Sequence, residues 1–347
     1  MKKILLALVC AVCLCSCAAG GNADSVTINV YNWGEYIGEG VVEGFTEETG
    51  INVNYDTYPT NEDMYAKLKS GGVNYDIAIP SDYMIERMIN EDMLEKLDLN
   101  NIPNYAKIDK RFNNLTYDPG GEYSVPYMWG TVGILYNTEM VSDPVDSWNI
   151  LWDGKYAGQI FMYDSMRDTL AVSLKRQGFS LNTKDLTQLE AAGVDLIAQK
   201  PLVQAYVGDT VRDSMIGNEA AFAVVYSGDA IYCMDNNEVL SYAVPKEGSN
   251  MWFDAIVIPK GSTRKAEAEK FIDYLCRPDV CLKNVEEIGY STVNSETFEM
   301  LPEEMKTNPA YWPPDEIYDR CEVFSDLGDF TDEYDRVWTE VLAASGG

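Results

Sequence analysis

The chain has 347 residues, no histidine and a formal net charge of −30, because 56 Asp and Glu oppose 26 Lys and Arg. The lack of histidine excludes Ser-His-Asp and Cys-His catalysis and histidine metal sites. The acidic balance argues against nucleic acid, whose binding needs a basic face. Such a field attracts cationic ligands, although it also keeps an exported protein soluble. We expect no metal, no cofactor and no nucleic-acid partner.

The first 25 residues read as an export signal and a tether rather than as part of the fold. Two lysines precede an apolar run that is too short to cross a bilayer comfortably, and small residues follow it. The sequence LCSC at 14–17 resembles a bacterial lipoprotein box. We therefore predict a signal peptide over 1–16, lipidation of Cys17 and a flexible tether over 17–25, with plain cleavage around Ala18 or Ala19 as the alternative. The protein would then be exported and lipid-anchored, on the outer face of the cytoplasmic membrane or in the periplasm.

Strands and helices alternate along the chain from residue 26 to residue 98. The expected elements, in order, are a strand at 26–30, a helix at 39–50, a strand at 51–58, a helix at 61–72 capped by Asn61, a strand at 75–81 and a helix at 82–98. This alternation implies a mostly parallel sheet with helices on both faces.

A second run of the same kind follows a stretch rich in turns and glycine at 118–137. Its expected elements are a strand at 159–163, a helix at 165–178, a strand at 220–226 with a helix after it, a strand at 255–259 and a helix at 263–277. We expect the chain to cross between two lobes near 129–131. The predicted first lobe is 26–130 with 254–298, and the second is 131–253 with 299–347.

Aromatic and acidic residues gather where the expected strands end. In open α/β sheets, ligands bind in the crevice beyond the carboxyl ends of the strands. The residues at these ends are Trp33, Glu35, Tyr36, Ser81, Asp82, Tyr83, Asp164, Ser165, Asp168, Tyr226 and Asp229. Trp252 and Asp254 stand just before an expected strand instead, where the chain returns between the lobes.

This mixture of residues favours a flexible aliphatic amine as the ligand. Aromatic faces attract cations and cover methylene groups, and a desolvated carboxylate holds an ammonium group through charge-assisted hydrogen bonds. Sugar sites use the same residue types, so the mixture alone does not separate the two ligands. Trp33 and its neighbours could also be core residues, and Asp168 could serve only the dipole of its helix.

Residues 29 to about 340 resemble the spermidine/putrescine-binding proteins of bacterial ABC importers. The segments that carry the resemblance are YNWGEYIGEGVVEGFTEETGINVNYDTY, NEDMYAKLKSGGVNYDIAIPSDY, YSVPYMWGTVGILYN, WFDAIVIPKG and RPDVCLKNVEEIGYSTVN. The resemblance implies an α/β, two-lobed periplasmic-binding-protein fold of type II that closes over a polyamine in the interlobe cleft. It also implies a membrane permease and an ATPase as partners, and no enzymatic activity.

The resemblance assigns roles to single residues as well. It implies cleft positions in the first lobe for Trp33, Gly34, Glu35, Tyr36, Ser81 and Tyr83. Trp252 would stack on the methylene chain, and Asp254 would be the principal carboxylate for an ammonium group. Tyr290 would be a wall residue, and Asp168 would meet the other end of the polyamine.

Three positions depart from the spermidine-preferring pattern, and a fourth matches putrescine-specific relatives. Tyr226 stands in place of a second cleft tryptophan, Ser165 in place of an acid and Phe324 in place of a glutamine. Asp229 matches an aspartate of putrescine-specific relatives, so it could grip a short diamine against another carboxylate, and Phe324 would shorten the cleft. Putrescine is therefore as plausible a ligand as spermidine.

Two other classes of protein stay open. A binding protein for a sugar, an amino acid or a metal would share the fold. An amino acid normally needs an arginine for its carboxylate, and the direction of Arg167 is unknown. A glycosidase would use a carboxylate pair such as Asp229 and Asp254, and turnover of an oligosaccharide would separate it from a binding protein.

Four cysteines follow the predicted signal peptide and tether, at 233, 276, 281 and 321. Their spacing matches no metal motif, whereas a disulfide stays open in an exported protein. We expect all four to be structural.

Overall fold

The computed structural model describes residues 26–208 and 210–344, so the predicted signal peptide, Cys17 and the whole predicted tether lie outside the described residues. The strands of this part are β1 Thr27–Trp33, β2 Asn52–Tyr58, β3 Ile77–Ala78, β4 Ser124–Asn137, β5 Ile160–Tyr163, β6 Val203–Val207, β7 Phe222–Tyr226, β8 Leu240–Ala243, β9 Met251–Val257 and β10 Ser291–Thr292. The α-helices are α1 Val41–Thr49, α2 Asn61–Ser70, α3 Asp82–Asn90, α4 Met166–Arg176, α5 Leu186–Gln199, α6 Val211–Ile216, α7 Ser227–Asn236, α8 Lys265–Leu275, α9 Pro278–Ile288, α10 Ser295–Met300, α11 Glu303–Thr307, α12 Asp315–Tyr318 and α13 Thr331–Ala343.

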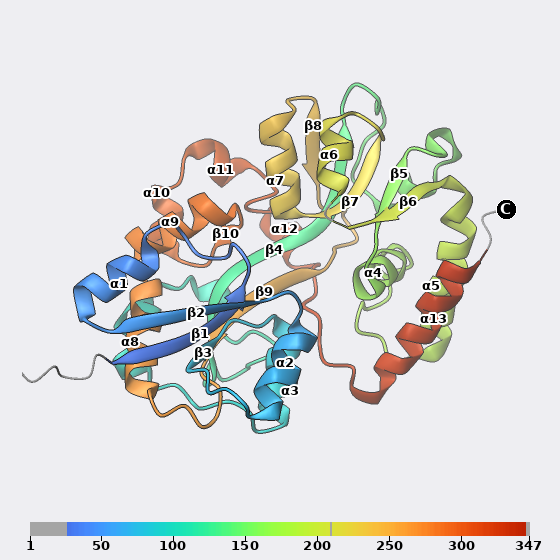
Figure 1. The fold of residues 1–347 in the computed structure, drawn as a ribbon. Helices are drawn as coiled ribbons and strands as arrows, with labels where there is room; N and C mark the ends of the chain where they lie inside the picture. Colours follow the sequence, from blue (N-terminus) through green and yellow to red (C-terminus); the bar gives the residue numbers. More distant parts are fainter. Residues whose placement is uncertain (1–25, 209, 345–347) are drawn as a thin grey trace, which may run out of the picture.

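The strands form one mixed sheet in which β4 and β9 join two parallel groups (Figure 1). The strand order is β2-β1-β3-β9-β4-β7-β5-β6, and β8 and β10 also pair with β4. Strand β1 is parallel to β2 and β3, and β5 is parallel to β6 and β7. The pairs that β4 and β9 make are antiparallel. The predicted α/β class with two lobes is confirmed, and the sheet is parallel only within each lobe.

The stretch expected to be rich in turns is largely one long strand. Strand β4 runs through both lobes, with Trp129 in one core and Val132 in the next. Gly130 allows the Trp252 ring to pack closely against β4, because a Cβ at position 130 would lie 2.6 Å from that ring. Trp252 and Asp254 lie within β9, not before it, since that strand begins at Met251 to pair with β4.

Each lobe has its own apolar core. We call first lobe the part packed around one large buried cluster, which includes β1–β3, β9, α1–α3, α8 and α9. The second lobe is packed around two further clusters and includes β5–β8, α4–α7 and α13. The expected division after residue 298 falls inside α10, and beyond it Leu301 joins the first core whereas Ala310 joins the second. Packing in this segment therefore does not follow a single boundary.

Two helices differ from their expected ends. The cap of α2 is Thr60, whose Oγ1 accepts a hydrogen bond from the Asp63 N–H at 3.1 Å, so the expectation of Asn61 as the cap is wrong. The Asn61 side chain instead accepts from the Ser81 N–H and donates to Tyr83 Oη. Helix α3 ends at Asn90 rather than near residue 98, because the chain turns to pair with the segment after β9.

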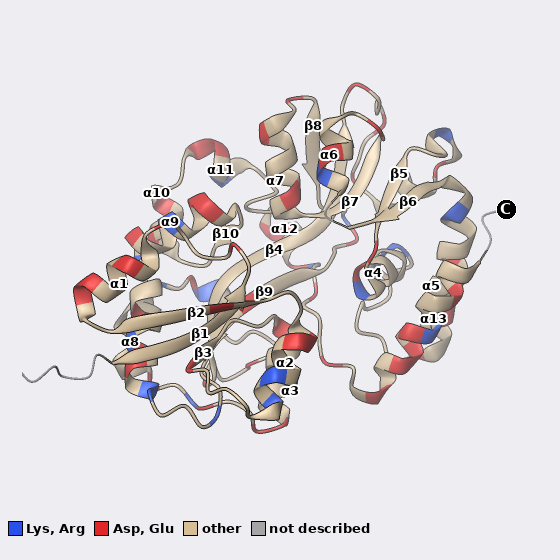
Figure 2. Cartoon of the chain, viewed as in Figure 1, with Lys and Arg blue, Asp and Glu red and all other residues tan. Residues whose placement is uncertain are grey.

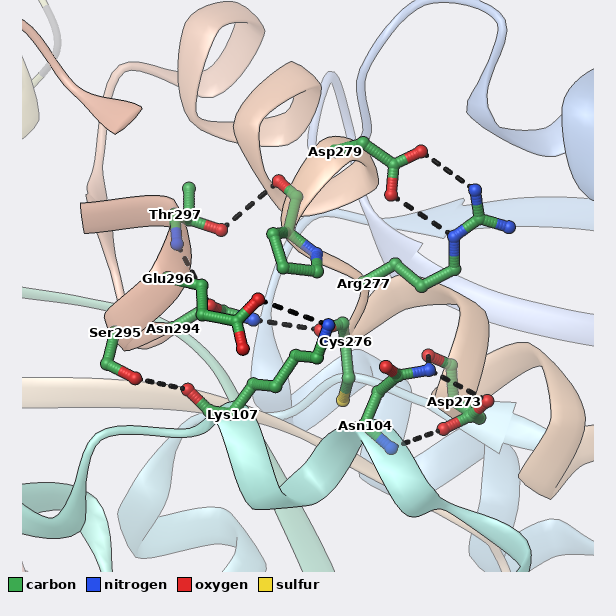
Figure 3. Close-up of polar contacts among 11 residues, drawn as sticks. Asn104, Lys107, Asp273, Cys276, Arg277, Asp279, Asn294, Ser295, Glu296 and Thr297 are labelled. Atoms are coloured by element: carbon green, nitrogen blue, oxygen red, sulfur yellow. Dashed lines mark hydrogen bonds and ion pairs between the residues drawn. The ribbon is translucent and has the colours of Figure 1, made fainter. Parts of the chain in front are cut away.

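Polar contacts fix the corner between α8 and α9 (Figure 3). Asn104 donates from its N–H and its Nδ2 to the Asp273 carboxylate, at 2.7 and 3.0 Å. Asn294 Nδ2 donates to the Cys276 carbonyl oxygen at 2.8 Å. Cys276 and the three other described cysteines are free thiols. The four cysteines are therefore unpaired packing residues in this structure.

Charge is spread over the outer helices rather than confined to one face. Acidic residues lie along α1, α5, α11 and α13 (Figure 2). Most Asp and Glu of the described residues are exposed or only partly buried. Within residues 26–208 and 210–344, none of the helices combines the length and the apolar character that crossing a bilayer requires.

Candidate functional site

The first lobe holds a buried carboxylate between two hydroxyl donors. Asp254 is 6% exposed, and Tyr36 Oη donates to its Oδ2 at 2.6 Å while Ser81 Oγ donates to its Oδ1 at 2.6 Å. Tyr36 follows the turn after β1, and Ser81 directly precedes α3. An ionised carboxylate accepts about four hydrogen bonds, so Asp254 keeps capacity for a cationic donor.

Burial makes this carboxylate hard to ionise. It raises the pKa of Asp254 to about 6, although the hydrogen bonds from Ser81 and Tyr36 lower it. Burial also raises the pKa of Asp82 to about 8, although the hydrogen bonds that the carboxylate accepts from the backbone N–H groups of Phe253 and Tyr83 lower that pKa. Asp82 is thus mostly neutral at pH 7, and Asp254 is the charged carboxylate of this group.

Four aromatic rings line up between the lobes, and we call them the aromatic wall: Tyr36, Tyr290, Trp252 and Tyr226. The Tyr290 ring centre lies 6.2 Å from that of Tyr36 and 4.7 Å from that of Trp252, both in edge-to-face contact. The Trp252 and Tyr226 centres lie 6.2 Å apart. Trp252 Nε1 is buried and has no hydrogen-bond partner within the described residues. The wall therefore offers apolar surface with one unused donor.

A second buried carboxylate lies in the second lobe. Asp168, in the first turn of α4, is 4% exposed. Its Oδ2 accepts from Ser165 Oγ at 2.7 Å and from Tyr226 Oη at 2.8 Å, and its Oδ1 accepts from Asn250 Nδ2 at 3.0 Å. Ser165 is also the cap of α4. Asn250 Oδ1 is buried without a hydrogen-bond partner in the described part, so a ligand N–H would satisfy it.

A third carboxylate already has a cationic partner. Asp229, in the first turn of α7, is 2% exposed. Arg212 Nε and Nη2 each lie 2.5 Å from its Oδ1. The Arg212 guanidinium group is therefore paired with the carboxylate that the sequence suggests as a binding partner for a diamine.

Phe324 lies at the interface between the lobes. It belongs to a small buried cluster of the second lobe, against which Tyr83 of the first lobe packs. The Arg167 guanidinium stacks on Phe324, 4.2 Å from the ring centre, and donates to the Ser325 carbonyl oxygen and to Asn182. Arg167 is thus held by this cluster, which answers the question of its direction.

The structure brings most of the expected site residues together. Those linked through the aromatic wall and the first two carboxylates are Tyr36, Ser81, Ser165, Asp168, Tyr226, Trp252, Asp254 and Tyr290. Trp33 packs on Tyr58 and donates to the Ile79 carbonyl oxygen, whereas Gly34 and Glu35 are exposed in the turn after β1. Their roles toward a ligand stay predictions.

Sequence reasoning missed Asn250 and Arg212 as members of the site. Each is far in sequence from the carboxylate it contacts, so no local pattern points to it. A measurable cavity, of about 200 Å³, lies between α5 and α13, away from all three carboxylates. At the site itself, side chains of the two lobes contact one another, as in a closed arrangement.

Similarity to known proteins decides the class. A family model for bacterial extracellular solute-binding proteins matches residues 40–313. The chain belongs to this family. Its match begins just before α1, ends just before α12 and so includes all three carboxylates. The candidate site of this solute-binding protein, defined by these carboxylates and the aromatic wall, lies where side chains of the two lobes contact one another.

Relatives of this solute-binding protein match along nearly the whole chain. The spermidine/putrescine-binding periplasmic protein of Salmonella typhimurium is 34% identical over 330 residues, which are 94% of this chain and 94% of that protein. The putrescine-binding periplasmic protein PotF of Escherichia coli is 28% identical over 365 residues, 98% of each. The solved structure of the spermidine/putrescine ABC transporter substrate-binding protein PotD of Streptococcus pneumoniae superposes with a TM-score of 0.87 at 41% identity, covering 92% of this chain and 99% of that one.

Proposed function

We propose that this solute-binding protein binds an aliphatic polyamine, putrescine or spermidine, between its lobes and delivers it to the membrane permease of an ABC importer driven by an ATPase. Asp254 carries the proposal. It is a buried carboxylate held by two neutral hydroxyl groups, and no Lys or Arg of the described residues lies within ion-pair distance of it. A buried charge needs a partner, and a ligand ammonium group supplies one.

The remaining geometry supports a ligand with two cationic ends and an apolar middle. Asp168 is the counterpart of Asp254 in the second lobe, and it too is held by neutral donors within the described part of the chain. The aromatic wall runs from the Asp254 side to Tyr226, which donates to Asp168. Its faces would cover the methylene groups of a polyamine. The relatives named for spermidine and putrescine support the same class of ligand.

Calorimetric titration tests the proposal. We would titrate residues 18–347, which contain every described residue, with putrescine, cadaverine, spermidine and spermine after unfolding, dialysis and refolding to remove carried-over ligand. Glucose, maltose, glutamate and 4-aminobutyrate serve as controls. We expect saturable one-to-one binding of at least one polyamine and none of the sugars. A refolded protein that binds a sugar or an amino acid but no polyamine would contradict the proposal.

We also propose that a lipid on Cys17 keeps the protein at the membrane, near its permease. One acyl chain gives only marginal binding, whereas two or more anchor stably. In the producing cell, we expect the wild type to partition with detergent and Cys17→Ser to partition with water. Equal partitioning of both proteins would contradict lipidation at this residue.

A further inference from the structure

The pairing of Asp229 sets it apart from the other two buried carboxylates. Asp254 and Asp168 are held by hydroxyl and amide groups, whereas Asp229 is held by the Arg212 guanidinium. The Asp229 side chain is 3% exposed and that of Arg212 is 41% exposed. An arginine stays protonated in proteins. The charge of Asp229 is therefore already balanced before any ligand arrives.

Asp229 nevertheless lies beside the aromatic wall. Tyr290 packs on Gly228, the residue before it, so closely that a Cβ there would come within 2.1 Å of the ring. Burial raises the pKa of Tyr290, Asp229 and then Asp254 raise it further, and Arg212 lowers it. Both carboxylates and the guanidinium thus act on one ring, which places the ion pair at the edge of the proposed site.

We propose that Arg212 is a specificity-determining residue that masks Asp229 and limits the site to two anionic anchors. The inference rests on the proposed function. With Asp229 masked, Asp254 and Asp168 match the two ammonium groups of a diamine. A triamine would bring a third ammonium group, and the third buried carboxylate, Asp229, is already paired with Arg212. This role differs from the expectation that Asp229 itself grips a diamine.

Two variants separate masking from direct binding. Arg212→Gln removes the guanidinium and leaves Asp229 as a third anchor, so we expect spermidine affinity to rise about tenfold or more and putrescine affinity to change less than about threefold. The double variant Arg212→Gln with Asp229→Asn has neither charge. We expect it to keep putrescine affinity within about threefold of wild type and to lose the gain for spermidine.

Arg212→Lys is the matched control, because it keeps a positive charge next to Asp229. We expect it to retain the wild-type ratio of putrescine to spermidine affinity. Thermal unfolding of each variant checks that the second lobe is folded. If Arg212→Gln fails to fold because it leaves a buried charge unpaired, the double variant still decides, since it contains no such charge.

The outcomes distinguish this inference from the proposed function. A loss of putrescine affinity beyond about tenfold in the folded double variant would show that Asp229 binds the ligand directly. That result would overturn the masking role of Arg212 and leave the proposed function standing. An unchanged ratio of putrescine to spermidine affinity in folded Arg212→Gln would likewise overturn only the masking role. A wild-type protein that binds none of the polyamines would overturn both.

Discussion

At the scale of single residues, buried carboxylates in and beside the candidate site are in three different electrostatic states. Asp254 is charged and held by neutral donors, Asp82 is mostly neutral because burial raises its pKa, and Asp229 is balanced by Arg212. The burial that raises the pKa of Asp254 lowers the stability of the free protein and increases the gain when a cation binds. Function at this residue therefore opposes stability.

Replacing the two acids of the first lobe should separate these roles. We expect Asp254→Asn to weaken polyamine binding about a hundredfold or more, because it removes a desolvated charge, and to leave the thermal midpoint equal or higher. Asp82→Asn is the matched control. It should leave binding at pH 7 within about threefold but lower the thermal midpoint, because an amide nitrogen cannot accept the backbone N–H of Phe253. Calorimetry and thermal unfolding measure both; equal losses of affinity would contradict this division.

The raised pKa of Asp254 predicts a pH dependence of binding. The carboxylate must be ionised to hold an ammonium group, so affinity should fall as the pH drops through about 6. Between pH 7.5 and pH 5 we expect a loss of about tenfold from this group. The folded state holds this proton to higher pH than the unfolded chain, so the contribution of this group to the stability of the fold is complete below about pH 4 and is lost as the pH rises from about 4 to about 6. Titrations across this range on wild type and Asp254→Asn measure the difference; an equal slope in both would exclude Asp254 as its source.

At the scale of elements, the first turn of α7 is shaped by close contact with the first lobe. Gly228 is the second residue of this helix, where alanine would ordinarily be the better helix former. Its missing side chain is explained by Tyr290, which occupies the space that a Cβ would take. The contact joins the helix that carries Asp229 to the aromatic wall.

A methyl group at this position should obstruct closure. We expect Gly228→Ala to reduce polyamine affinity about tenfold or more while leaving the thermal midpoint of the ligand-free protein nearly unchanged, because the clash arises only when the lobes approach. Gly154→Ala in the second lobe is the control, since a Cβ there meets open space. Should Gly228→Ala bind as tightly as Gly154→Ala, Tyr290 does not form this contact in the bound state.

At the scale of the whole molecule, the two lobes touch at several places beyond the wall. Tyr83 packs on the Phe324 cluster, and the Asp326 N–H donates to Glu86 Oε2 at 2.7 Å. Both contacts join α3 of the first lobe to the segment that leads into α13 of the second lobe. A ligand that contacts both lobes favours such a closed form through its differential interactions.

Closure should be visible as a change of size in solution. We expect saturating putrescine to lower the radius of gyration of the wild type in small-angle scattering, because the ligand-free lobes sample open forms. Asp254→Asn at the same putrescine concentration should not contract. A wild-type radius that is identical with and without bound ligand would mean that binding does not require the lobes to move.

The sequence by itself determined the alternation of strands and helices, the two lobes and the strand ends beyond which Ser81 and Asp168 lie. Hydrophobic period and strand-end position are local properties that the chain carries in its order. Only the tertiary structure decided that β4 runs as one strand through both lobes, that Asn250 meets Asp168 and that Arg212 neutralises Asp229. These facts depend on contacts between residues distant in sequence, and on burial, which alone decides whether a carboxylate is charged, neutral or already paired.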